Sequence, residues 1–163
     1  MSWFTMISTL LGTALGITST LFTERIRARD VVKRERAIVV MDAYVAFITA
    51  MHHAKGNIRT VALEIERIDE SERGAKARQA FRGSGVYETL ERLILLAPEG
   101  VVHAANSLFL ILRDHRYIVA NGNNPNSELY RQNSARYAEA LHNLRSLVRE
   151  DIGLESFNQN VPF

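Results

Sequence analysis

The sequence contains no cysteine among its 163 residues. This absence excludes disulfide scaffolds, thiolate metal sites and cysteine nucleophiles, and it fits a reducing cytoplasm. Residues that break regular structure are also scarce, with three prolines and nine glycines. Few breakers, together with many Ala, Leu, Arg and Glu residues, favour long helices over many short strands.

An excess of charge of one sign is missing as well. The formal net charge is +2, from 20 basic and 18 acidic residues. A chain this close to neutral lacks the broad basic field that attracts nucleic acid, so we expect no nucleic-acid partner. The sequence has no P-loop, dinucleotide-binding glycine fingerprint or nucleophile elbow. We therefore expect neither a cofactor nor an enzyme activity.

The first 23 residues carry no charged side chain. A helix over the twenty residues 3–22 reaches about 30 Å, the hydrocarbon thickness of a bilayer. We predict a transmembrane anchor helix over residues 1–23. A cleaved signal peptide is an alternative, although nothing basic precedes the apolar run. Another alternative is a soluble helical oligomer, in which the N-terminal helices form an inter-subunit core or a chamber for an apolar ligand.

The flanks of this segment predict its orientation. Basic residues follow it closely, namely Arg25, Arg27, Arg29, Lys33, Arg34 and Arg36. The positive-inside rule then predicts a single-pass protein of the cell inner membrane, with the N-terminus outside and the C-terminal domain cytoplasmic. Trp3 is expected at the outer interface. The basic residues are expected to contact anionic lipids of the inner leaflet, each worth about 1 kcal/mol near the surface.

One face of the anchor is lined by small residues. Gly12 and Gly16 form a G-x-x-x-G motif, and Thr5, Thr9 and Ser19 extend the same face. Small residues let two helix backbones approach closely in lipid. We predict a homo-oligomer that packs through this face. Packing against another membrane protein, as an accessory subunit of a larger complex, is the alternative.

The rest of the chain is predicted to be all-α. We expect a cytoplasmic antiparallel helical bundle over residues 24–157 and a loose tail over 158–163. Its long amphipathic second helix should end near Asp69. Apolar positions spaced by three and four residues form the stripe expected to face the core, namely Ile38, Met41, Val45, Ile48, His52, Ile58, Val61 or Ala62, Ile65 and Ile68.

Local signals place the later helices. The charged stretch 69–85 is helical in propensity but contains Gly74, and a helix is expected over 86–96. Pro98 marks a helix start, and residues 121–127 form a loop whose Ser127 or Asn126 caps a last helix that runs to about Ile152. The stripe of that helix is Leu129 or Tyr130, Asn133, Tyr137, Leu141, Leu144 and Val148.

Several segments together resemble a group of small actinobacterial membrane-anchored helical proteins of uncharacterised function. After the G-x-x-x-G segment and the Arg-rich exit come "DAYVAF", "YETLERLILLAPEGVVHAA" and "LRSLVREDIG". The resemblance covers nearly the whole chain. It implies the same architecture and carries no activity or site residues.

The five histidines do not form a metal-binding pattern. His52 and His53 are adjacent, and adjacent residues on a helix point about 100° apart. His103 and His115 are twelve residues apart, and Glu139 and His142 have the spacing of a Glu-x-x-His pair but no counterpart elsewhere in the sequence. We interpret the histidines as helix-surface or bundle-edge residues and Asp114-His115-Arg116 as a solvated helix end, and we expect no metal site.

These observations favour a scaffold protein. The chain is expected to self-associate through its N-terminal helix and to present its cytoplasmic bundle to a partner in protein–protein interaction.

Overall fold

A computed structural model describes residues 34–154 of the chain. The chain divides into two units, Met1–Val39 and Val40–Phe163. The predicted anchor over residues 1–23 and the predicted tail over 158–163 lie outside the described residues. The fold described below is therefore that of the second unit, together with the helical residues 34–39 that precede it.

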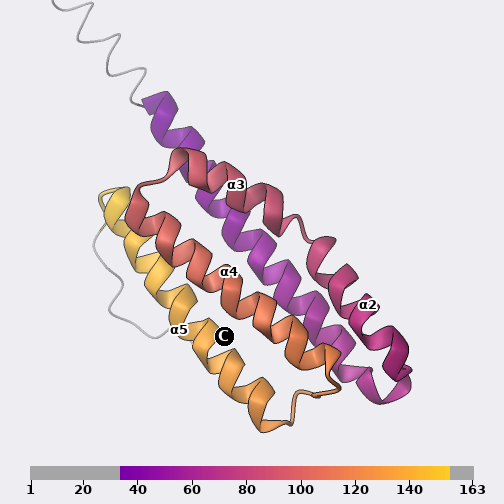
Figure 1. The fold of residues 1–163 in the computed structure, drawn as a ribbon. Coiled ribbons are helices and arrows are strands. Elements are labelled where there is room, and N and C mark those ends of the chain that lie inside the picture. Colours follow the sequence, from indigo (N-terminus) through magenta and orange to yellow (C-terminus); the bar gives the residue numbers. More distant parts are fainter. Residues whose placement is uncertain (1–33, 155–163) are drawn as a thin grey trace, which may run out of the picture. The chain divides into compact units, whose positions relative to one another are not determined.

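Every regular element in the described residues is helical, and residues 34–154 include no strand. A 30-residue helix spans Arg34–Leu63. A single 3-10 turn, η1 (Ile65–Arg67), leads to α2 (Glu70–Arg82) and α3 (Val86–Leu96), followed by the two long helices α4 (Glu99–Ala120) and α5 (Glu128–Asp151). Figure 1 shows α4 and α5 side by side, with α2 and α3 following each other along α4. The prediction of an all-α bundle is confirmed.

Helix ends fall where the local chemistry places them. Pro98 is the N-cap of α4, and the Ser127 hydroxyl accepts a hydrogen bond from the backbone N–H of Tyr130 at the start of α5. Gly122, just after α4, has φ +86°, which an L side chain rarely adopts. The loop predicted over 121–127 and the last helix are confirmed.

The Arg34–Leu63 helix ends six residues before the predicted end at Asp69. The prediction failed because Ile65 and Ile68 kept the helical spacing, whereas the chain turns there with both side chains buried. The turn allows α2 to begin after Asp69, and α2 runs as a helix through Gly74. Spacing alone did not separate a continuing helix from a buried turn.

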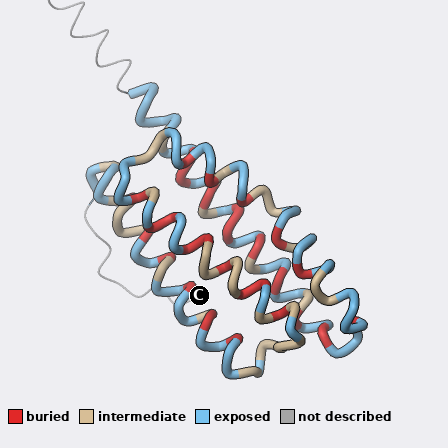
Figure 2. The backbone as a smooth tube through the Cα atoms, viewed as in Figure 1, coloured by how far each residue is buried: buried red, intermediate tan, exposed pale blue. Residues whose placement is uncertain are grey.

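The core lies among the described helices and contains the predicted stripe of α5. Tyr130, Asn133, Tyr137, Leu141, Leu144 and Val148 are all buried. Leu129, the alternative to Tyr130, is exposed. In Figure 2 the buried positions recur along α5 at helical intervals, as an amphipathic helix requires.

The predicted stripe of the Arg34–Leu63 helix is wrong in its first half. Ile38, Met41 and Val45 are 68%, 43% and 57% exposed, and His52 is exposed as well. The buried positions of this helix are instead Ala43, Tyr44, Phe47, Ala50, Met51, Ala54, Ile58 and Ala62. This face combines large side chains with alanines that let neighbouring helices come close, so it packs better than a row of branched residues. The second half of the prediction, from Ile58 to Ile68, is confirmed.

Side-chain contacts join the Arg34–Leu63 helix to three others. The Tyr44 hydroxyl donates to Oδ2 of Asp151 on α5 at 2.6 Å. Nη2 of Arg92 on α3 lies 2.7 Å from Oδ2 of Asp42. The Asn57 amide donates to the carbonyl oxygen of Ala80 on α2. The long helix therefore organises the bundle.

Among the described residues, the Arg34–Leu63 helix is also the one that is long and apolar enough to cross a membrane. Core helices of bundles share this composition. Less than half of its apolar stretch is buried within the chain. Most of that stretch is therefore not covered by this chain's own bundle.

Candidate functional site

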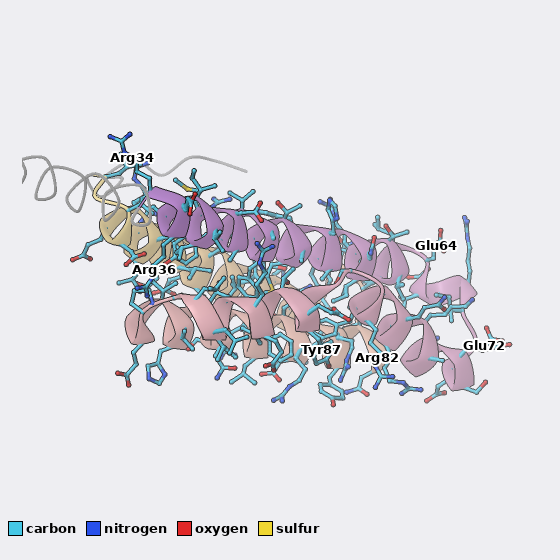
Figure 3. The ribbon with its side chains drawn as sticks, turned by 90° about the horizontal axis from the view of Figure 1, so that it is seen from above. Arg34, Arg36, Glu64, Glu72, Arg82 and Tyr87 are labelled. Carbon is cyan, nitrogen blue, oxygen red and sulfur yellow. The ribbon has the colours of Figure 1, made fainter. Side chains whose placement is uncertain are left out.

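Most residues predicted to pack helices or contact lipid lie outside the described residues. These are Trp3, Thr5, Thr9, Gly12, Gly16, Ser19, Arg25, Arg27, Arg29 and Lys33. Arg34 and Arg36 are described, and both are exposed on the first turn of their helix. Figure 3 shows the Arg34 side chain extending away from its helix. The exposure of these two arginines is compatible with a role at an anionic surface.

A polar cluster lies in the core where α4 faces α5. Nδ1 of His115 donates to Oδ1 of Asn133 at 2.8 Å, and the ring of Tyr130 lies 4.3 Å from the imidazole, centroid to centroid. His115 is 1% exposed and Asn133 is equally enclosed. Because the amide oxygen can only accept, it selects the imidazole tautomer that carries its proton on Nδ1. Asn133 therefore orients the ring.

The surroundings of His115 favour its neutral form. Burial lowers the pKa of His115, the hydrogen bond that its ring donates to Asn133 raises it, and the charge of Lys55 lowers it further. Nε2 of this ring and the hydroxyl of Tyr137 are both buried without a hydrogen-bond partner among the described residues. A general base must reach its substrate. The enclosure of His115 fits a structural role better than a catalytic one.

The interpretation of Asp114-His115-Arg116 as a solvated helix end is wrong. His115 and Arg116 are both buried, and only Asp114 retains substantial exposure. The Arg116 guanidinium lies 4.3 Å from the centroid of the Tyr117 ring and 5.4 Å from that of Phe81. The segment lies within α4 rather than at its end, and aromatic faces make the burial of the guanidinium tolerable. His115 alone of the five histidines contradicts the expected surface position, because the other four are exposed.

The exposed histidines do not converge on a common point. His103 lies 3.4 Å from Oε1 of Glu99 on its own helix, and Nε2 of His52 lies 3.0 Å from the Arg145 guanidinium. No cluster of three potential metal ligands occurs within residues 34–154.

A basic patch follows the line where the Arg34–Leu63 helix meets α5. We define it as Lys55, Arg59 and Arg145. The Lys55 ammonium lies 4.4 Å from the centroid of the Tyr137 ring. Arg59 follows one helical turn later. Burial and the charge of Arg59 both lower the pKa of Lys55, whereas burial raises the pKa of Tyr130 against the opposing charge of Arg59. The sequence showed these residues only as scattered bases, because the two helices meet only in the folded chain.

A second surface lies on the side of the Arg34–Leu63 helix that faces away from the core. We define this outer face as Met41, Val45, Thr49, Gly56 and Leu63, which are all exposed. None of these side chains is charged, and a Cβ added at Gly56 would meet no atom within 4 Å. The signal that could have revealed this face was present in the sequence, since the helix carries two apolar rows and one bundle buries only one of them.

Comparison with protein-family models, curated proteins and solved structures gives no match to this chain. The resemblance to the actinobacterial group therefore stays a prediction. Proposals about function rest on the geometry described above.

Proposed function

We propose that this protein is a membrane-anchored scaffold without catalytic activity, which pairs with a second copy and presents its helical bundle to a partner. Residues 1–23 form the anchor, with Gly12 and Gly16 at the helix–helix contact. The Arg-rich segment that follows places the bundle on the cytoplasmic side. The uncharged N-terminal sequence and the exposed Arg34 and Arg36 support this arrangement.

The observation that carries the proposal is the outer face of the Arg34–Leu63 helix. This helix is long and apolar enough by composition to cross a membrane, yet less than half of its apolar stretch is buried within the described residues. Apolar area removed from water stabilises a complex by about 25 cal/mol per Å². The exposed apolar side chains gather toward the start of the helix, at Ile38, Met41 and Val45, and exposed apolar clusters mark interaction sites on soluble domains.

A second copy of the same helix is the occupant that fits the outer face best. Met41 and Val45 continue the alternating three- and four-residue spacing of Ile38, which is the spacing of coiled-coil contact positions. Gly56 costs about 1 kcal/mol relative to alanine inside a helix. Nothing within residues 34–154 approaches Gly56 closely enough to require glycine. A partner helix that comes close at this point would explain it.

The antiparallel arrangement of the bundle belongs to the same proposal. Along the Arg34–Leu63 helix, Tyr44, His52 and Lys55 meet Asp151, Arg145 and Tyr137 of α5. The numbers rise on one helix as they fall on the other, which supports opposite chain directions. This arrangement leaves the outer face of the Arg34–Leu63 helix available to a second copy.

The decisive experiment compares two lysine substitutions in the full-length protein in nonionic detergent. Val45 on the outer face is 57% exposed and Leu129 on α5 is 56% exposed, so Leu129→Lys is a matched control for Val45→Lys. We expect V45K to lower the crosslinked dimer fraction severalfold and L129K to leave it unchanged. Equal dimer fractions in both variants would show that the outer face does not pair.

The anchor is tested separately. Gly12→Ile with Gly16→Ile should lower the oligomer order in the same crosslinking experiment, because bulky side chains separate the helices. Full-length protein should remain in membranes after an alkaline carbonate wash. Release of the full-length protein into the soluble fraction would contradict the anchor and favour a soluble oligomer.

A further inference from the structure

In the basic patch of Lys55, Arg59 and Arg145, two of the cations have no acidic partner among the described residues, namely Lys55 and Arg59. Elsewhere in the bundle bases meet acids: Lys76 pairs with Glu72, Arg92 with Asp42 and Arg131 with Glu128. Within residues 34–154, neither Lys55 nor Arg59 forms an ion pair or a side-chain hydrogen bond. The chain has nearly as many acids as bases. The patch is therefore not a consequence of overall composition.

The electrostatic neighbours of the patch point the same way. Lys55 lowers the pKa of His115 and of His52, and Arg145 lowers the pKa of His52 and of Tyr137. Burial is the largest cause in all three residues. It lowers the pKa of the two histidines and raises the pKa of Tyr137. The charges that act on His115 and Tyr137 are basic.

Holding these cations together has a cost that an anion would offset. Like charges one helical turn apart destabilise a helix by about 0.2 to 0.5 kcal/mol. Burial already lowers the pKa of Lys55, whose ammonium rests on the Tyr137 ring rather than in water. Arg59 is exposed, and its planar guanidinium can donate hydrogen bonds to two oxygens at once. The patch therefore combines the half-buried ammonium of Lys55 with the accessible guanidinium of Arg59.

We propose that the basic patch is a binding site for a phosphate group. The Lys55 ammonium supplies a charge at the base of the site, and the Arg59 guanidinium closes on the phosphate oxygens from the solvent side. Arg145 on α5, which contacts His52, adds a positive charge at the border of the patch. Phosphate fits because its two negative charges match several cations, and paired guanidinium N–H groups bind its oxygens in a bidentate manner. The phosphate group comes from a soluble phosphate compound or from a lipid headgroup.

The test is the thermal unfolding of full-length protein in nonionic detergent, followed by circular dichroism. Sodium phosphate is compared with sodium chloride at equal ionic strength, so that general screening cancels. We expect phosphate at about ten times its dissociation constant to raise the Tm by roughly 3 to 6 °C. Equal melting temperatures in the two salts at every concentration, together with no rise when phosphatidic acid is supplied in the micelle, would overturn the proposal.

The variants locate the effect. Lys55→Met with Arg59→Met should abolish the phosphate-dependent rise, because methionine keeps the apolar stem without the charge. Lys76→Met removes a lysine that is paired with Glu72 on α2 and should retain the full rise. Arg59→Met alone changes an exposed side chain and keeps the test valid if the double variant folds poorly. A full rise in R59M and in the double variant would overturn the proposal.

Doped micelles identify the source of the phosphate group. Phosphatidic acid is added to one sample and phosphatidylcholine to another, and the variants are repeated in both. A rise with phosphatidic acid that K55M/R59M abolishes supports a lipid headgroup. A rise with free phosphate alone supports a soluble ligand. The absence of a rise both with free phosphate and with phosphatidic acid would overturn the proposal.

Discussion

Nδ1 of His115 lies 2.8 Å from Oδ1 of Asn133, and both side chains are closed off from water. The two residues are 18 positions apart and come from facing helices. A buried polar group without its partner costs about 1 to 3 kcal/mol. This hydrogen bond therefore contributes to the register of α4 against α5.

Asn133→Ala should lower the free energy of unfolding by about 1 to 3 kcal/mol, because the N–H of His115 loses its acceptor in the core. Urea unfolding of the variant and the wild type measures the difference. Asn143→Ala, at an exposed position of the same helix, is the control and should change stability little. An unchanged unfolding midpoint in N133A would show that the hydrogen bond makes no net contribution to the free energy of unfolding.

Stability should fall as the pH drops below about 6.5, the ordinary pKa of histidine. The pKa values of His115 and His52 are lowered in the folded state, chiefly by burial. The unfolded chain therefore binds protons that the folded chain refuses, and acid favours unfolding. For His115 the loss reaches at most about 1.4 kcal/mol per pH unit between its unfolded and folded pKa values. Above about 6.5 this contribution is constant.

Urea unfolding at a series of pH values checks the acid dependence. His115→Gln should flatten the profile between pH 5 and 7 relative to the wild type. His142→Gln, at an exposed position, is the control and should leave the profile as it is. A wild-type profile that is level through this range would contradict the buried neutral imidazole.

Tyr44→Phe should destabilise the protein by about 1.5 to 3 kcal/mol. The Tyr44 hydroxyl donates to the Asp151 carboxylate at 2.6 Å, and hydrogen bonds to charged groups contribute about this much. The bond joins the Arg34–Leu63 helix to the end of α5, which are 107 residues apart. Tyr117→Phe removes a hydroxyl from an exposed ring and should cost far less. Equal effects of the two substitutions would argue against the Tyr44–Asp151 bond.

Two glycine substitutions should change stability in opposite directions. Gly56→Ala should stabilise the monomer by up to about 1 kcal/mol, because the added Cβ meets open space within a helix. Gly122→Ala should destabilise it, because φ is +86° and the new Cβ would lie 3.0 Å from Nη1 of Arg73. Thermal unfolding of both variants at low protein concentration measures the difference. In the proposed dimer, G56A should also weaken pairing, because the helix backbones would be held apart.

Helix existence and most helix ends could be predicted from the sequence, because they depend on neighbouring residues. Pro98 lacks a backbone donor and the Ser127 hydroxyl caps the chain that follows it, wherever these segments lie in the fold. The stripe of α5 was equally legible, since its opposite face is polar and only one side can be buried. These features are decided within a few residues, and the all-α class followed from them.

Only the tertiary structure decided which face of the Arg34–Leu63 helix is turned toward the core. Both the row of Ile38, Met41 and Val45 and the row of Tyr44 and Phe47 are apolar, and periodicity assigns no preference between them. Packing against α5 and α3 selected the second row, because its aromatic side chains and alanines fit those helices closely. The first row was left on the surface.

The candidate sites follow the same division. The sequence by itself determined the uncharged N-terminal segment, the Arg-rich stretch after it and the absence of known catalytic motifs, because these are properties of continuous stretches. The burial of His115 beside Asn133 and the meeting of Lys55 with Tyr137 required α4, α5 and the Arg34–Leu63 helix to assemble. Contacts between residues far apart in the chain depend on how helices pack, and no local pattern encodes which side chains will meet.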